Sequence, residues 1–155
     1  MKKTALFLLL LTCAIPIISF SKDIGLGIII GSPTGFSGNY MLSKKHSIDG
    51  ALAFDLSGDK NLHFHSSYLW RYPKSVPFND LEFGWYWGLG GKYRTHDNDR
   101  DADDDYRIGA RGSIGTNYEF TDVPVEIFAE GSLIMNFLPE TDADFDIGIG
   151  ARYYF

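Results

Sequence analysis

The chain has almost no cysteine, because Cys13 is the single one among 155 residues. It lies in an apolar run from Thr4 to Phe20 that follows the positive stretch Met1-Lys2-Lys3 and ends in the small-residue pattern Ser19-Phe20-Ser21. This arrangement is typical of a secretory signal peptide and predicts cleavage after residue 21. The predicted mature chain, residues 22–155, contains no cysteine, so its fold owes nothing to disulfides although it enters an oxidising compartment.

Two other interpretations of this first segment are weaker. A retained membrane helix fits poorly, since Pro16 interrupts the run and no stop-transfer pattern follows it. A lipobox, Leu10-Leu11-Thr12-Cys13, would make Cys13 a lipidated N-terminus. Thr12 stands where a Gly, Ala or Ser is expected, and the apolar run continues past the cysteine.

The sequence also lacks a second long apolar run and a basic stripe. Without such a run a helical membrane protein is excluded, and a membrane-embedded mature chain must be a closed barrel. The formal net charge is −6, and it becomes −8 when Lys2 and Lys3 leave with the signal peptide. An acidic chain of this kind does not favour nucleic acid as a partner.

Beyond residue 22 the chain contains apolar and polar residues that alternate with period two, which predicts β-strands. Aromatic and β-branched residues recur in stretches separated by clusters of Gly, Pro, Ser, Asn and Asp. A link at residues 71–82 and a very polar segment at residues 95–105 interrupt the pattern. The eight predicted strands are residues 24–30, 36–42, 46–55, 61–70, 83–94, 106–120, 125–137 and 145–155.

The two faces of these strands differ in charge. One face is free of charge and rich in large apolar side chains, including Ile28, Phe36, Leu52, Phe64, Trp87, Leu89, Ile114, Ile127, Leu133, Ile147 and Ile149. The other face combines many glycines with Asp49, Asp55, His63, His65, Lys92, Arg94, Arg107, Arg111, Glu119, Glu126, Glu130, Asp146 and Arg152. Aromatic residues gather at the strand ends, as in the interfacial girdles of membrane barrels.

This division of charge predicts a barrel with its polar side chains inside. In a soluble barrel of eight strands the large aromatic residues would fill a narrow interior and the glycines would cover the outside. With the faces reversed, lipid contacts the apolar set and small residues make room for charges in the lumen. We therefore predict an all-β fold, an eight-stranded antiparallel up-and-down transmembrane β-barrel, acting as a monomer in the outer membrane of a Gram-negative-type bacterium.

Several segments resemble known outer-membrane proteins. The end of the chain, Ile147-Gly148-Ile149-Gly150-Ala151-Arg152-Tyr153-Tyr154-Phe155, is similar to the C-terminal signal that the barrel-assembly machinery reads, with Tyr153 and Phe155 as its key residues. Residues 25–38, 49–53, 62–70 and 123–130 resemble a family of small, uncharacterised bacterial outer-membrane barrels. The resemblance implies an OmpA- or OmpX-like eight-stranded barrel with both termini in the periplasm, and it implies no known activity.

Two groups of residues are candidates for binding a metal ion. Asp97, Asp99, Asp101 and Asp103 offer oxygen ligands of the kind that Ca²⁺ prefers, but the segment lacks the glycine and the glutamate of an EF-hand. An acidic, solvated loop is the simpler interpretation. His63 and His65 share one strand face and can chelate a transition metal, but a pair of lumen histidines hydrogen-bonded to carboxylates is the favoured interpretation.

An enzyme is a further hypothesis. Lipid A deacylases are eight-stranded outer-membrane enzymes that use a His-x-Ser pair with a Glu, and His65 and Ser67 have that spacing, with Glu82 or Glu130 as the orienting acid. This pair faces the lumen, whereas a lipid substrate approaches from outside. We therefore predict a protein without catalysis and without a cofactor.

The charged residues of the lumen face are predicted to form a structural ionic network. Its predicted members are Asp49, Arg107, Arg111, Glu119, Glu126, Glu130 and Arg152. The predicted function is a structural or surface-interaction role in the outer membrane, with outer-membrane lipid and the assembly machinery as partners. A narrow channel for small solutes or ions and a lipid A-modifying enzyme are the alternatives.

Overall fold

The computed structural model describes residues 22–54, 62–96, 105–139 and 141–155 of the chain, and its regular elements are strands. Among these residues no helix is long and apolar enough to cross a membrane. The predicted signal peptide, Cys13 and the acidic residues Asp97, Asp99, Asp101 and Asp103 lie outside the described residues. The strands are β1 Ile24–Ser32, β2 Gly35–Ser43, β3 His46–Phe54, β4 Leu62–Phe78, β5 Leu81–His96, β6 Asp105–Glu119, β7 Val125–Leu138 and β8 Asp142–Tyr154.

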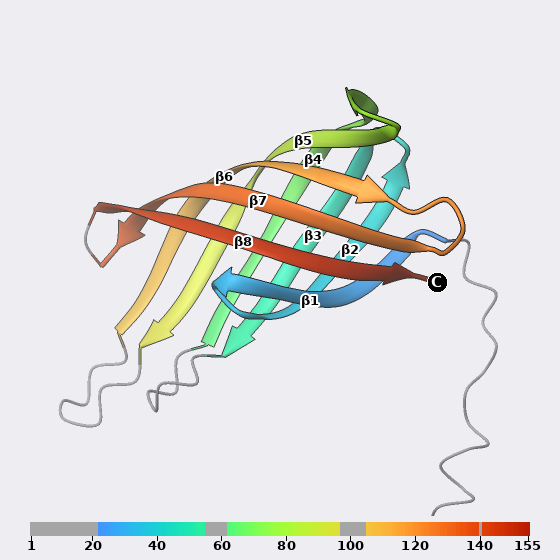
Figure 1. Ribbon diagram of the computed structural model, residues 1–155. Coiled ribbons are helices and arrows are strands. Elements are labelled where there is room, and N and C mark those ends of the chain that lie inside the picture. The colour runs from blue at the N-terminus through green and yellow to red at the C-terminus, as the bar shows by residue number, and fades with distance from the viewer. Residues whose placement is uncertain (1–21, 55–61, 97–104, 140) are drawn as a thin grey trace, which may run out of the picture.

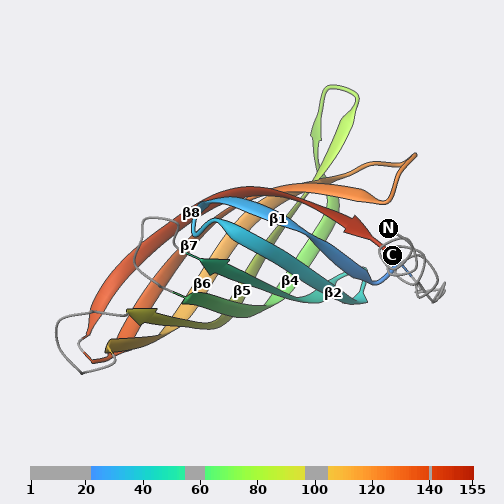
Figure 2. The ribbon, with the colours of Figure 1, turned by 90° about the horizontal axis from the view of Figure 1, so that it is seen from below.

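The strands form a closed antiparallel barrel in which each strand pairs with its neighbours in sequence (Figure 1). The ring closes between β1 and β8, where Gly25 lies opposite Tyr154 and Ser32 lies opposite Ile147. The strands cross the barrel at a steep tilt (Figure 2), as closure of eight strands requires. The predicted all-β, eight-stranded, up-and-down barrel is therefore confirmed, with the start of β1 and the end of β8 at the same rim.

The burial of the side chains follows the period-two alternation of the sequence. Outward-facing residues such as Ile28, Phe36 and Ile114 are exposed. Inward-facing residues are buried, and they include far more polar than apolar side chains. Successive residues of a strand point to opposite faces of a sheet, so the alternation in the sequence separates apolar from polar side chains. The apolar side chains form the outer surface and the polar ones fill the interior, which is the reverse of a soluble protein.

The link predicted at residues 71–82 is wrong. β4 continues to Phe78 and β5 begins at Leu81, so these residues form a long hairpin that projects beyond the rim (Figure 2). A register shift lies between Tyr72 and Val76, and Asn79 at the hairpin tip has a φ of 54°. The prolines at 73 and 77 favoured a loop in the sequence. Proline is nevertheless tolerated in a strand at a β-bulge or where no neighbouring strand needs its N–H, and both conditions are met in a hairpin that extends past the barrel.

Several inward-facing glycines make room for aromatic rings in the lumen. A Cβ atom at Gly115 would overlap the ring of Tyr86, and one at Gly150 would overlap the ring of Phe128. Both rings are buried inside the barrel. The sequence suggested that the glycines accommodate charged side chains, but these two accommodate aromatic rings from the neighbouring strand.

Candidate functional site: the ion-pair network of the lumen

The lumen holds a set of buried charges that come from most of the strands. Its cations are Arg71 on β4, Lys92 on β5, Arg111 on β6 and Arg152 on β8, and each is at most 7% exposed. Its carboxylates are Asp49 on β3, Glu126 and Glu130 on β7, and Asp146 on β8, and each is at most 5% exposed. The described lumen therefore buries equal numbers of positive and negative side chains.

Glu126 is the centre of the network near the rim where the termini lie. Arg71 Nη2 donates to its Oε2 at 2.5 Å, and Tyr154 Oη donates to the same oxygen at 3.1 Å. Arg152 Nη1 reaches its other carboxylate oxygen, Oε1, at 3.5 Å. Hydrogen bonds to a charged acceptor are stronger than neutral ones, so these three contacts offset part of the cost of burying Glu126.

Arg152 links this centre to the opposite wall. Its Nη2 donates to Asp49 Oδ2 at 3.1 Å, and its Nε donates to Ser37 Oγ at 3.0 Å. The guanidinium carbon also lies 4.0 Å from the centre of the Phe128 ring, which is a cation–π contact. One side chain on β8 thereby contacts residues of β2, β3 and β7.

Two further pairs lie toward the other rim. Arg111 donates through Nη2 to Glu130 and through Nη1 to Ser67 Oγ, the latter at 2.9 Å. Lys92 Nζ donates to Asp146 Oδ2 at 2.6 Å. The pairs Arg71–Glu126, Arg152–Asp49 and Lys92–Asp146 each join strands three places apart in the ring of eight. They cross the lumen and do not run along its wall.

Two predicted members of the network lie at its edges. Arg107 is half-exposed and pairs with Asp142 at 3.2 Å and with Asp144 at 3.9 Å, so it belongs to a separate cluster at the rim. Glu119 is 48% exposed at the other rim, where it pairs with Arg71 at 3.2 Å and accepts from Asn117 Nδ2 at 3.3 Å. The structure brings together Asp49, Arg111, Glu126, Glu130 and Arg152, with Lys92 and Asp146 beside them.

Three buried members of the network were not predicted as members: Lys92 and Asp146, which were predicted only to face the lumen, and Arg71, which was predicted to lie in a link. Arg71 stands next to two aromatic residues and before Pro73, which placed it in a link. The alternation of the strand could have identified it, because His65, Ser67, Leu69 and Arg71 are every second residue of β4 and therefore share the inward face. The buried Tyr86 on β5 was missed for a similar reason, since aromatic residues were expected outside.

Both predicted histidines lie on the inward face of β4, and His65 also lies among carboxylates of other strands. His65 is buried, as are Asp49 and Glu130. One imidazole nitrogen and one carboxylate oxygen of each acid lie within 4.8 Å of one another. Among the described residues, this group does not include His63, which is less buried. A group with the donor types of a metal site therefore exists, but it is formed with carboxylates from β3 and β7.

The predicted catalytic arrangement is only partly assembled. Ser67 Oγ accepts the hydrogen bond from Arg111, and both Ser67 and His65 are buried at 2% exposure. Glu82 lies on the projecting hairpin and pairs with Lys74 at 3.7 Å. His65 lies opposite Lys92, so Glu82 is about ten residues away along β5, roughly 33 Å at about 3.3 Å per residue. Glu130 is the only one of the two proposed acids that approaches His65.

The predicted assembly residues lie at the end of β8. Tyr153 and Phe155 are about half-exposed on the outward face, and their rings meet edge to face at 5.0 Å. The Phe155 amide donates to the Ile24 carbonyl at 3.0 Å, which continues the pairing with β1. Aromatic stacking also occurs on β4 and β5, where Trp70 stacks on Trp87 at 4.3 Å.

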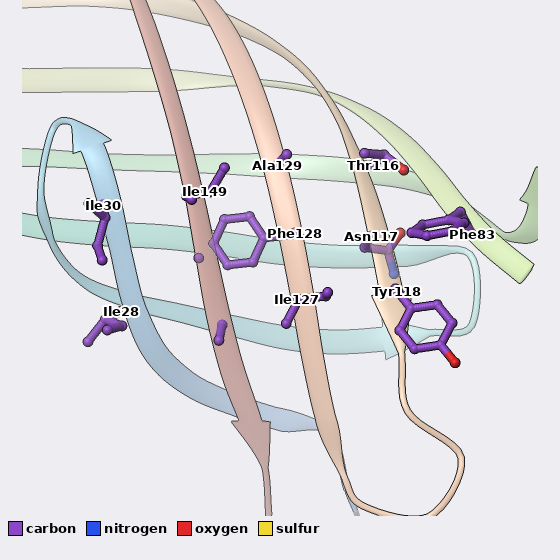
Figure 3. A pocket seen from close by; sticks show the side chains of 12 residues that line it. Ile28, Ile30, Phe83, Thr116, Asn117, Tyr118, Ile127, Phe128, Ala129 and Ile149 are labelled. Carbon is purple, nitrogen blue, oxygen red and sulfur yellow. The ribbon is translucent and has the colours of Figure 1, made fainter. Parts of the chain in front are cut away.

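The outward face carries an apolar groove of about 470 Å³ that is lined by residues of β1, β5, β6, β7 and β8. Small residues of β6, β7 and β8, such as Thr116 and Ala129, form its floor, and Ile28 and Ile30 border it on one side (Figure 3). Phe83 and Tyr118 border it on the other side (Figure 3). The lining is mostly apolar, and its polar residues include Asn117 and Thr116, whose hydroxyl donates to the Gly84 carbonyl at 2.8 Å.

A solved structure shares this fold. The crystal structure of the N-terminal beta-barrel domain of Pseudomonas aeruginosa OprF superposes with a TM-score of 0.61 at 13% sequence identity. The match covers 85% of this chain and 95% of that chain. At this identity the likeness shows the β-barrel fold alone. No family model and no curated protein matches the chain, so the resemblance to one family of small outer-membrane barrels stays a prediction.

Proposed function

We propose that this protein is a small integral outer-membrane β-barrel that acts as a monomer in a structural or surface-interaction role, without catalysis. The observation that carries the proposal is the inverted distribution of side chains, with apolar residues outside and paired charges inside. A water-soluble protein does not expose an apolar band around its whole circumference. In lipid, this band is the favoured surface, and a closed ring of strands satisfies every inter-strand hydrogen bond.

The crossing ion pairs support a lumen that does not conduct. Arg152, Arg71 and Lys92 each span the interior to reach a carboxylate on a strand three places away. An eight-stranded barrel has an interior that side chains can fill, and these pairs occupy it at several levels. We therefore place the function on the surface and the rims of the barrel, not in a solute pathway.

The likeness to the OprF barrel domain supports a barrel of this kind, and the C-terminal Tyr153 and Phe155 support recognition by the barrel-assembly machinery. With both termini in the periplasm, the β4–β5 hairpin also projects into the periplasm. Val76, Phe78 and Leu81 are exposed on this hairpin, and we propose that a partner binds there.

Cell fractionation followed by gel electrophoresis with and without boiling tests the proposal. We expect the protein in the outer-membrane fraction, with different mobility before and after boiling, because a closed barrel resists detergent until heat opens it. A soluble periplasmic protein without such a shift would refute the membrane assignment. Reconstitution in planar bilayers tests the closed lumen, and stepwise conductance there would favour the channel alternative.

A further inference from the structure

We propose that Asp49, His65 and Glu130 form a binding site for a transition-metal dication inside the barrel. The three residues come from β3, β4 and β7, and one ligand atom from each lies within 4.8 Å of the other two. At ordinary metal–ligand distances of about 2.0–2.2 Å, small changes in side-chain torsions bring these atoms around one ion. All three side chains are buried, so no bulk solvent competes for them.

The second observation is that each carboxylate has one oxygen to spare. Asp49 Oδ2 accepts from Arg152, while Asp49 Oδ1 is buried without a hydrogen-bond partner among the described residues. Glu130 Oε1 accepts from Arg111, while Glu130 Oε2 is likewise buried and without such a partner. Buried polar atoms are normally satisfied, and the two carboxylates in the described part of the chain that keep a buried, unpartnered oxygen are the two that group with the His65 imidazole, so each can accept a cation.

Arg111 and Arg152 do not contact the unpartnered oxygens, but they hold the two carboxylates in place. Arg152 and Arg111 each hold the other oxygen of a carboxylate, which is the usual arrangement of groups that orient metal ligands from outside.

The donor set selects the class of ion. One imidazole nitrogen with two carboxylate oxygens suits Zn²⁺, Mn²⁺, Fe²⁺ or Co²⁺ better than Ca²⁺ or Mg²⁺, which prefer oxygen alone. Because β3 and β4 are neighbours and β7 lies across the ring, a bound ion ties opposite walls of the barrel together. Its role is then structural, as a cross-link that adds to the ion pairs of the lumen.

Cobalt titration of the full-length protein, purified in detergent and freed of metal with EDTA, tests the site. We expect a single equivalent of Co²⁺ to give the visible absorption of an ion with protein ligands. A parallel titration adds Co²⁺ during refolding from urea, so that the ion can reach the buried site before the barrel closes. We also expect Co²⁺ or Zn²⁺ to raise the temperature at which the barrel converts to the boiled form.

His65→Gln and Asp49→Asn are the test variants, and His63→Gln is the matched control. Gln at position 65 keeps the volume and Asn at position 49 keeps an acceptor for Arg152, and the gel shift on boiling checks that both variants form the barrel. We expect at least a tenfold weaker Co²⁺ affinity in both, and less than a twofold change in the control.

Absence of the cobalt spectrum in both titrations would overturn the proposal. Equal loss in the His63 and His65 variants would overturn it too, because the histidine pair would then be the site. Unchanged binding in both test variants would place the ion elsewhere, such as the acidic residues 97–105. The gel shift on boiling reports the barrel itself, so the metal site and the proposed membrane function can fail separately.

Discussion

Replacing Glu126 with alanine should destabilise the barrel far more than its single charge suggests. Glu126 is fully buried and accepts from Arg71, Arg152 and Tyr154. Removal of the carboxylate leaves two buried guanidinium groups with fewer partners in a medium where charge is costly. The matched control is Glu82→Ala, since Glu82 also pairs with a cation but both side chains of the Lys74–Glu82 pair are 61% exposed.

The expected magnitude follows from the remaining contacts. Removing one partner of a buried ion pair costs about 3–5 kcal/mol. The lower end applies here, because Arg71 keeps Glu119 at 3.2 Å and Arg152 keeps Asp49 at 3.1 Å. A loss of about 3 kcal/mol changes the unfolding equilibrium by roughly a hundredfold. The exposed control pair at 3.7 Å contributes about 0–1 kcal/mol.

Equilibrium unfolding in urea, with the protein reconstituted in lipid vesicles, measures the difference. Tryptophan fluorescence reports the transition, because Trp70, Trp85 and Trp87 lie on the outward face of β4 and β5. We expect the free energy of unfolding to fall by about 3 kcal/mol for Glu126→Ala and by less than about 1 kcal/mol for Glu82→Ala. Equal losses for the two variants would refute the reasoning, since the lumen pairs would then be as well solvated as a surface pair.

Three other perturbations test the packing and the facing of the strands. Ile114→Arg puts a charge on the apolar face at a cost of about 2–4 kcal/mol and should block insertion, whereas Ala51→Ser on the lumen face should be mild; membrane fractionation distinguishes them. Gly115→Ala drives a methyl group into the Tyr86 ring and should cost about 1–3 kcal/mol in urea unfolding, while Gly131→Ala, whose Cβ would lie 3.5 Å from its nearest neighbour, should change little. Deletion of Phe155 should slow assembly in cells, and unchanged pulse-chase kinetics would count against the terminal signal.

Much of the fold was predictable because a strand places successive residues on opposite faces. That rule correctly assigned Ile114 and Leu133 to the outside and Asp49 and Glu130 to the lumen. It failed where the loop preference of individual residues opposed the hydrogen-bonded pairing of two strands. The prolines at 73 and 77 favoured a loop, and the pairing of β4 with β5 beyond the rim overrode that preference.

The candidate site was less predictable than the fold. The sequence grouped His63 with His65, because the two residues share a strand face. The structure also places His65 with Asp49 and Glu130, and these residues are 16 and 65 positions away in the chain. Proximity across a lumen depends on the stagger between distant strands, and no local pattern encodes that stagger.

The amino-acid sequence by itself determined which residues face outward and which face inward, and from their charges it determined an inverted barrel of eight strands. This was possible because the pleat has a period of two and one of the two strand faces carries no charged residue. Only the tertiary structure decided the partners: Arg71 with Glu126, Arg152 with Asp49, and Lys92 with Asp146. Those pairings arise from ring closure, which sets the register and tilt of all eight strands together and brings side chains of non-neighbouring strands to the same level of the lumen.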